Sequence, residues 1–195
     1  MMHPPPPPEE ASAFEREIGR YRRYLSLLAR IQMDRKLRGR MDPSDIVQQT
    51  MLEAFQARDQ YQGEATGQRI AWLRRILARN LADAARDHGR ARRDVALERS
   101  LEQSLGTSSA RLGEWLAADQ TSPSEHVARD EEVLDLVDAL VGLADRDLDI
   151  IVARHWHGRA LSEIAGELGT TRYEVTKSYR EALERVRQLL ESDRD

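Results

Sequence analysis

The chain of 195 residues contains no cysteine, so it has neither a disulfide framework nor a thiolate metal site. Aromatic residues make up only 5% of the chain, and strand-favouring runs are few. Alanine, leucine, arginine and glutamate dominate instead, and this composition predicts an all-helical protein. No apolar run approaches the roughly 20 residues that span a bilayer, and the N-terminus lacks the apolar segment of a secretion signal. We therefore expect a soluble, cytoplasmic protein with no membrane partner.

Signatures of catalysis are missing as well. The sequence has no glycine-rich phosphate loop, and no serine, histidine and aspartate residues grouped closely along the chain. His155 and His157 flank Trp156, but no acid or cysteine is placed to join them as metal ligands. We therefore predict no enzyme activity, no metal and no cofactor, although residues distant in the sequence could still assemble a catalytic group.

Charge is distributed unevenly along the chain, whose formal net charge is -4. Residues 1–94 hold 18 Lys and Arg against 13 Asp and Glu, whereas residues 95–195 hold 12 against 21. A net negative charge alone argues against nucleic acid as a partner. The asymmetry between the halves is informative in itself, so the charge has to be judged segment by segment.

The segment 161–182 has the pattern of a helix-turn-helix. Apolar residues spaced three and four apart form one face of a short helix. Gly169 then ends this helix, because the residue just past a helix C-terminus often needs a positive φ. Ala165 and Val175 have the spacing that lets two helices cross closely over a short turn.

The second helix of this segment begins at Thr171, which can cap it, with Glu174 completing a capping box. The side chains that this helix presents outward are Arg172, Tyr173, Lys177 and Arg180. Such a helix suits the major groove of DNA, with its N-terminal end leading. The alternative is a helical hairpin that only helps to fill a core.

Two helices are predicted in the first third of the chain. Residues 1–12 include five consecutive prolines and predict a disordered tail, and a helix follows from about Phe14 into the thirties. Asp42 and Pro43 mark the start of the next helix as its N-cap and first residue. Its predicted buried stripe consists of Val47, Met51, Ala54 and Phe55.

A loop and a strongly basic helix come next. Residues 58–68 predict a loop, in which Tyr61 is either a stacking platform for a base or a packing residue. The helix that follows has an exposed arginine stripe opposite its apolar face, formed by Arg75, Arg79, Arg86 and Arg90. Residues 69–93 contain eight arginines against two aspartates, which favours a phosphate-binding surface over a merely solvated one.

The middle of the chain changes character. Residues 94–124 have short apolar patches interrupted at Gly106 and again before residue 124, and we predict a linker with transient helix and no core. Trp115 in this segment suggests docking on a partner or on a neighbouring domain. One helix is then predicted to end near Gly142, and Asp145 is predicted to cap the next helix.

Two separated blocks resemble one known family. DPSDIVQQTMLEAFQA followed by AWLRRILARNLADAAR is similar to the second conserved region of bacterial sigma factors, and residues 131–190 resemble their fourth conserved region. The short length resembles the extracytoplasmic-function class of the sigma-70 family. The resemblance implies two small helical domains: a region 2-like domain at 13–94, a linker at 95–124 and a region 4-like helix-turn-helix domain at 125–195.

The resemblance also implies a transcription initiation factor that binds the β′ and β subunits of core RNA polymerase and directs the enzyme to promoter DNA. The matching polymerase-binding residues are Asp45, Gln48, Gln49 and Glu53. The residues expected to contact and help melt the -10 element are Tyr61, Arg75, Arg79, Asn80, Asp83, Arg86 and Arg90. Those expected to read the -35 element are Thr171, Arg172, Tyr173, Glu174, Lys177 and Arg180. An anti-sigma protein is a further candidate partner.

The sequence departs from the family pattern at two places. Gln49 stands where an acid is usual, and the basic residues near Glu174 are shifted, so the -35 sequence that is read is expected to be unusual. The acidic second half suggests the hypothesis that it repels DNA when the protein is free. The competing function is a conventional helix-turn-helix regulator that is not a polymerase subunit, but its first domain would not need an eight-arginine helix.

Overall fold

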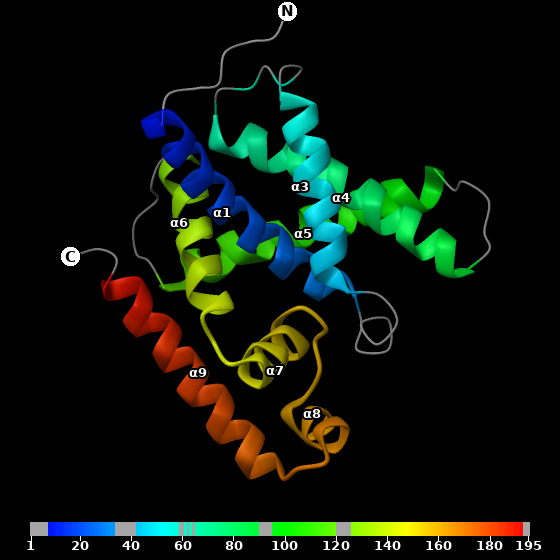
Figure 1. Ribbon diagram of the computed structural model, residues 1–195. Coiled ribbons are helices and arrows are strands. Elements are labelled where there is room, and N and C mark those ends of the chain that lie inside the picture. Colours follow the sequence, from blue (N-terminus) through cyan, green and yellow to red (C-terminus); the bar gives the residue numbers. More distant parts are fainter. Residues whose placement is uncertain are drawn as a thin grey trace, which may run out of the picture.

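The computed structural model describes residues 8–33, 42–58, 61, 63, 65–89, 95–119 and 126–192. Within these ranges the fold is all-α, with eight helices and no strand (Figure 1). The helices are α1 Pro8–Gln32, α3 Pro43–Gln56, α4 Thr66–Gly89, α5 Val95–Asp119, α6 His126–Val141, α7 Asp145–His155, α8 Leu161–Leu168 and α9 Arg172–Ser192. The prediction of an all-helical chain is therefore confirmed.

Helix α1 lies at the centre of the molecule, where it contacts α3, α4, α5 and α6 (Figure 1). Tyr24, Leu25 and Leu28 of this helix are fully buried. The helix begins at Pro8, so residues 8–12 are helical and the predicted disordered tail is wrong for them. Proline fits the first turn of a helix because its missing N–H would have no partner there. The rest of the predicted tail lies outside the described residues.

Helix α3 starts as the sequence indicates, with the Asp42 carboxylate accepting a 2.8 Å hydrogen bond from the Ser44 backbone N–H. Its buried face comprises Ile46, Val47, Thr50 and Ala54. Val47 and Ala54 are buried, as predicted. Met51 is only half-buried, and Phe55 is 47% exposed. The apolar face is rotated toward Ile46, since the spacing 46, 47, 50 and 54 is equally helical.

Helix α4 buries the apolar face that the sequence predicts, with Ile70, Leu73, Leu77 and Leu81 in the core. It begins at Thr66, so the last three residues of the predicted loop are already helical. The opposite face carries the arginine stripe. The fold therefore presents these basic side chains away from the core, on a helix that the leucines hold in place.

Helix α5 replaces the predicted linker, because residues 95–119 form one continuous helix. Its Leu105, Leu112 and Leu116 are buried in the same core as the leucines of α1 and α4. Gly106 was read as a break, but a glycine costs a helix only about 1 kcal/mol relative to alanine. Full burial of a leucine side chain contributes about 1.5–3 kcal/mol, so the three leucines outweigh it. The expectation that this segment has no core is wrong.

Helices α6 to α9 form the C-terminal part of the acidic half. Helix α6 ends at Val141, close to the predicted Gly142. Helix α7 begins at Asp145, but the N-cap position belongs to Ala144 and has no side-chain hydrogen bond, so Asp145 is a first-turn acid and not the cap. Its charge still interacts favourably with the positive end of the helix dipole.

Ion pairs join the two halves across the junction of α1 with α6 and α7. They link Arg20 with Glu131 and Asp135, Arg23 with Asp138, and Arg30 with Asp145 and Asp149, at 2.5–3.0 Å. Half-exposed pairs of this kind contribute only about 0–1 kcal/mol each, so the shared apolar core holds the halves together and the pairs fix their register. These five acids of α6 and α7 thus have partners within the chain.

Trp115 of α5 packs against His155 and Trp156 at the end of α7. This agrees with one of its two predicted roles, docking on a neighbouring part of the chain. Its ring stacks on His155 of α7 with centroids 4.4 Å apart, and the His155 Nε2 lies 3.0 Å from the hydroxyl of Tyr179 on α9. Burial and then the nearby Arg154 lower the pKa of His155. The neutral imidazole is therefore the form that this stack favours.

Candidate nucleic-acid and polymerase interfaces

The helix-turn-helix is formed by α8 and α9, which meet at the turn around Gly169 (Figure 1). Gly169 has φ of +62°, the left-handed conformation that the sequence predicted for it. Ile164 and Ala165 of α8 pack with Val175 of α9 and Ile150 of α7 in a small separate cluster. This cluster fixes the crossing of the two helices, so the outward face of α9 is held rigidly.

The N-terminal half of α9 projects into solvent. The Thr171 hydroxyl accepts a 3.2 Å hydrogen bond from the Glu174 backbone N–H, which is half of the predicted capping box. The side chains exposed on this face include all that the sequence predicted as -35 contacts: Thr171, Arg172, Tyr173, Glu174, Lys177 and Arg180. Tyr173 is 74% exposed, an unusual position for an aromatic ring without a partner molecule.

On α4 the predicted -10 contacts have a different environment. Arg75 donates to Glu102 of α5 at 3.2 Å, and Arg79 pairs with Glu53 of α3. Arg86 pairs with Asp83 one turn earlier on the same helix. Each of these arginines thus meets a carboxylate of its own chain. Arg90 lies outside the described residues.

Asn80 does not lie on the basic surface of α4. Its side chain is buried, and its amide donates a 3.1 Å hydrogen bond to the hydroxyl of Thr50 on α3. Thr50 in turn donates to the backbone carbonyl of Ile46. The buried amide and hydroxyl satisfy one another, so in this arrangement Asn80 joins α3 to α4.

Tyr61 lies in the loop before α4 and stacks on Trp72, with ring centroids 4.9 Å apart. One face of its ring is therefore covered by the helix, as the packing alternative anticipated. Burial raises the pKa of Tyr61, and among the described residues its buried hydroxyl has no hydrogen-bond partner. The Arg69 guanidinium also lies over the Tyr61 ring, 5.8 Å from its centroid, so a base could stack only on the part of the ring that Trp72 and Arg69 leave uncovered.

The exposed face of α3 carries the residues that match the polymerase-binding pattern. Asp45, Gln48 and Gln49 are exposed, whereas Glu53 is partly buried. Burial alone would raise the pKa of Glu53, but hydrogen bonds from Gln49 and Arg79 outweigh it and lower the pKa. Glu53 therefore stays ionised and connects the α3 face to the arginine stripe of α4.

Sequence reasoning missed two features of these surfaces. Leu52 is 50% exposed and lies beside the equally exposed Phe55 on α3, which gives the face an apolar part. Arg99 and Glu102 of α5 lie against the arginine stripe, because α5 is a helix packed on α4. The signal for α5 was its leucine spacing of seven and four residues, which is helical.

Other kinds of site find no support in the part of the chain that the structure describes. No described helix is both long enough and apolar enough to cross a membrane. No group of three or more potential metal-ligating side chains occurs within those ranges either. The candidate surfaces are the polar face of α3, the basic stripe of α4 and the outward face of α9.

Together these features define an all-helical DNA-binding protein with a C-terminal helix-turn-helix and a basic helix in its first half. A family model described as Sigma-70 region 2 matches residues 20–91, and one described as Sigma-70, region 4 matches residues 139–188. The matched segments together span more than half of the chain, which belongs to the sigma-70 family of sigma factors. No curated protein and no solved structure matches the chain.

Proteins with these two regions are non-enzymatic transcription initiation factors that bind core RNA polymerase and promoter DNA. The chain accordingly has a sigma-factor role in promoter recognition. Helix α4 lies within the first matched segment and the helix-turn-helix within the second.

Proposed function

We propose that the chain is an initiation factor of the extracytoplasmic-function class, which contacts the -10 element through α4 and reads the -35 element through α9. One observation carries this proposal: the basic stripe of α4 and the open basic face of α9 lie in the two different matched segments of one short chain. The matched segments end at residue 91 and resume at residue 139, with α5 and most of α6 between them. Such spacing leaves no room for a further large domain.

For the -35 element we assign base reading to the exposed side chains of α9. Arg172 and Arg180 suit bidentate contacts to guanine, and Tyr173 offers apolar contact to a thymine methyl group. The N-terminal end of a recognition helix is the part that reaches base edges, and these residues lie in its first turns. Their exposure means that they can reach the groove without a change in packing.

For the -10 element we assign phosphate contacts to Arg75, Arg79 and Arg86. An arginine paired with an exposed carboxylate loses little when it exchanges that partner for a phosphate, because such pairs contribute about 0–1 kcal/mol. Tyr61 would receive an extruded base on the part of its ring that Trp72 and Arg69 leave uncovered. We do not include Asn80, since it is buried against α3.

For core polymerase we assign Asp45, Gln48 and Gln49 of α3, together with the exposed Leu52 and Phe55 beside them. Interfaces with strong binding residues combine an apolar centre with a polar rim, and this face offers both. Glu53 belongs to the edge of the face because it is shared with Arg79. An anti-sigma protein remains a further candidate partner, and the proposed role requires the cytoplasm, where polymerase acts.

Run-off transcription with core polymerase on genomic DNA fragments tests the proposal, since mapped start sites should share two sequence elements at the -10 and -35 positions. Asp45→Arg should weaken binding to core polymerase at least tenfold, about 1.4 kcal/mol, because it reverses a charge on the exposed face. Glu191→Arg, an equal charge change at the far end of α9, should bind normally. Absence of start sites, or normal core binding by the Asp45 variant with its helix content intact, would contradict the proposal.

A further inference from the structure

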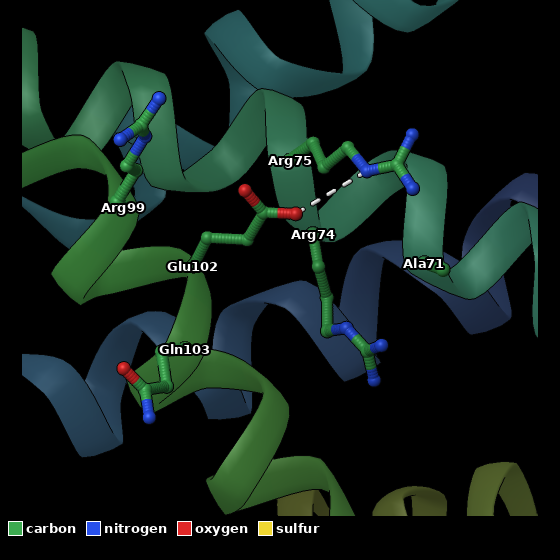
Figure 2. Close-up of a pocket in the computed structure, with 6 residues that line it drawn as sticks. All are labelled: Ala71, Arg74, Arg75, Arg99, Glu102 and Gln103. Carbon is green, nitrogen blue, oxygen red and sulfur yellow. Dashed lines mark hydrogen bonds and ion pairs between the residues drawn. The ribbon is translucent and has the colours of Figure 1, made fainter. Parts of the chain in front are cut away.

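A hollow of about 410 Å³ lies between α4 and α5, beside the basic stripe of α4, with which it shares Arg75 (Figure 2). The residues that line it are Ala71, Arg74, Arg75, Arg99, Glu102 and Gln103. The last three come from α5, which follows the end of the first matched segment at residue 91. The family match therefore gives no role to half of this lining.

The hollow has more positive than negative charge. The lining contains three guanidinium groups and one carboxylate, that of Glu102, which forms an ion pair with Arg75 at 3.2 Å (Figure 2). Within the described part of the chain, Arg74 makes only a long 3.5 Å contact to the hydroxyl of Tyr24. Among the described residues, no acid pairs with Arg99. The net formal charge of the lining is thus +2.

The lining indicates what kind of ligand suits the hollow. Its volume lies within the roughly 300–1,000 Å³ of small-molecule sites, but those sites are mostly apolar and this lining is mostly charged. Arginine binds phosphate and carboxylate with paired N–H donors, and such charge-assisted bonds are about twice as strong as neutral ones. An anion with several oxygens is the chemistry that this group of side chains recognises.

We propose that this hollow binds a phosphate group, and that Glu102 occupies part of the site until the phosphate displaces its carboxylate from Arg75. The Arg75–Glu102 pair is weak because the two side chains are 68% and 48% exposed. A phosphate would therefore replace it at little cost while also engaging Arg99. Arg99 becomes a ligand-binding residue contributed by α5, and Glu102 an internal competitor for the same site.

Two sources can supply the phosphate, and they share the same chemistry. One is the backbone of a nucleic-acid strand that lies along α4, and this source rests on the proposed function. The other is a free phosphate compound that enters the hollow alone. Both require Arg99, so the first variant to make is Arg99→Ala in the full-length chain. Its matched control is Arg22→Ala, which removes an exposed arginine from α1.

Fluorescence anisotropy with a labelled single-stranded oligonucleotide, measured at several salt concentrations, tests the first source. Arg99→Ala should weaken binding and reduce the slope of log affinity against log salt by about 0.7, the value for one lost phosphate contact on a single strand. Arg22→Ala should keep the wild-type slope. Titration with inorganic pyrophosphate, followed by calorimetry, tests the second source with the same two variants.

Glu102→Gln tests the competitor. It should raise affinity for the probe that requires Arg99 about two- to fivefold, the change expected when an exposed ion pair is released. Glu114→Gln makes the same change of net charge at another exposed position of α5 and should leave affinity unchanged. Equal gains in both variants would show a net-charge effect and overturn the proposal.

The remaining outcomes are also decisive. Dependence on Arg99 for the oligonucleotide alone identifies the nucleic-acid backbone, and dependence for pyrophosphate alone identifies a free phosphate compound. Binding of neither probe, or binding of both without Arg99, overturns the phosphate site. Run-off transcription with core polymerase is measured separately with wild-type protein, so a failure of this site is distinguishable from a failure of the proposed function.

Discussion

Two helices carry the residues predicted to contact DNA, and they differ in what their basic side chains touch. On α9, Arg172 and Arg180 are exposed, and Lys177 lies 4.0 Å from Glu181, the outer limit of an ion pair. On α4, the described arginines of the predicted stripe each pair with a carboxylate from α3, α4 or α5. Arginines expected to contact DNA are thus open on α9 and paired on α4.

The difference follows from what surrounds each helix. Helix α9 packs through one face on the small cluster of the helix-turn-helix, so its first turns stand clear of other elements. Helix α4 packs between α3 and α5, and both neighbours bring acids to its edges. The α9 surface can therefore engage a groove directly, whereas the α4 surface must first exchange carboxylates for phosphates.

The largest effect should come from breaking the cluster that holds α9 in place. Ile150→Ala removes a fully buried side chain between α7, α8 and α9, and such changes cost about 2–5 kcal/mol. We expect a lower unfolding midpoint in denaturant and loss of -35 recognition, while core binding through α3 persists. Leu189→Ala, near the exposed end of α9, should be close to neutral. Equal loss of core binding would show that the two regions unfold together.

The helices of this chain could largely be predicted because each has a periodic apolar face and a readable start. Asp42, Pro43 and Gly169 behave as their local chemistry dictates, since capping and positive φ depend on near neighbours. Helix α5 was missed because its stability comes from burial of leucines against α1 and α4. That burial depends on contacts between residues distant in the sequence. The local glycine and serine residues therefore led to the wrong prediction of a linker.

The candidate site could be predicted in outline but not in its contacts. Spacing alone gave the outward face of α9, because exposure on a helix follows from its period. It could not foresee that Asn80 turns inward to Thr50, or that Glu53 and Glu102 reach the arginines of α4. Those contacts depend on how three helices cross, and a helical period does not specify the crossing.

A smaller effect should come from removing one of the exposed arginines of α9. Arg172→Ala removes an exposed arginine from the first turn of α9 and should cost about 1–3 kcal/mol at one base pair if it reads a guanine. Competition assays with polymerase holoenzyme on promoters varied across the -35 element would show relaxed preference at that position. Arg185→Ala, exposed in the C-terminal half of α9, should leave the preference intact. Uniform weakening across all sequences would instead assign Arg172 to a phosphate.

The smallest effect concerns His155 of α7, which connects α5 with α9 through its contacts to Trp115 and Tyr179. Burial and then Arg154 lower the pKa of His155, so folding favours the neutral ring. Its contribution to stability is present above the unfolded pKa of about 6.5, and it is lost as the pH falls through the lower folded value. Acidification should therefore weaken the stack between α5 and α7.

His155→Phe isolates this contribution because it keeps an aromatic ring on Trp115 and removes the titrating group. The free energy of unfolding of wild type and variant should be compared by urea titration between about pH 5.5 and pH 7.5, across the titration of an unperturbed histidine. Wild type should lose stability on acidification more steeply than the variant, while the variant loses the hydrogen bond to Tyr179 at every pH. Parallel curves would mean that the ring does not titrate with folding. The α5 helix would then be joined to the DNA-reading helix by packing alone, and the open and paired surfaces would not be coupled by proton binding.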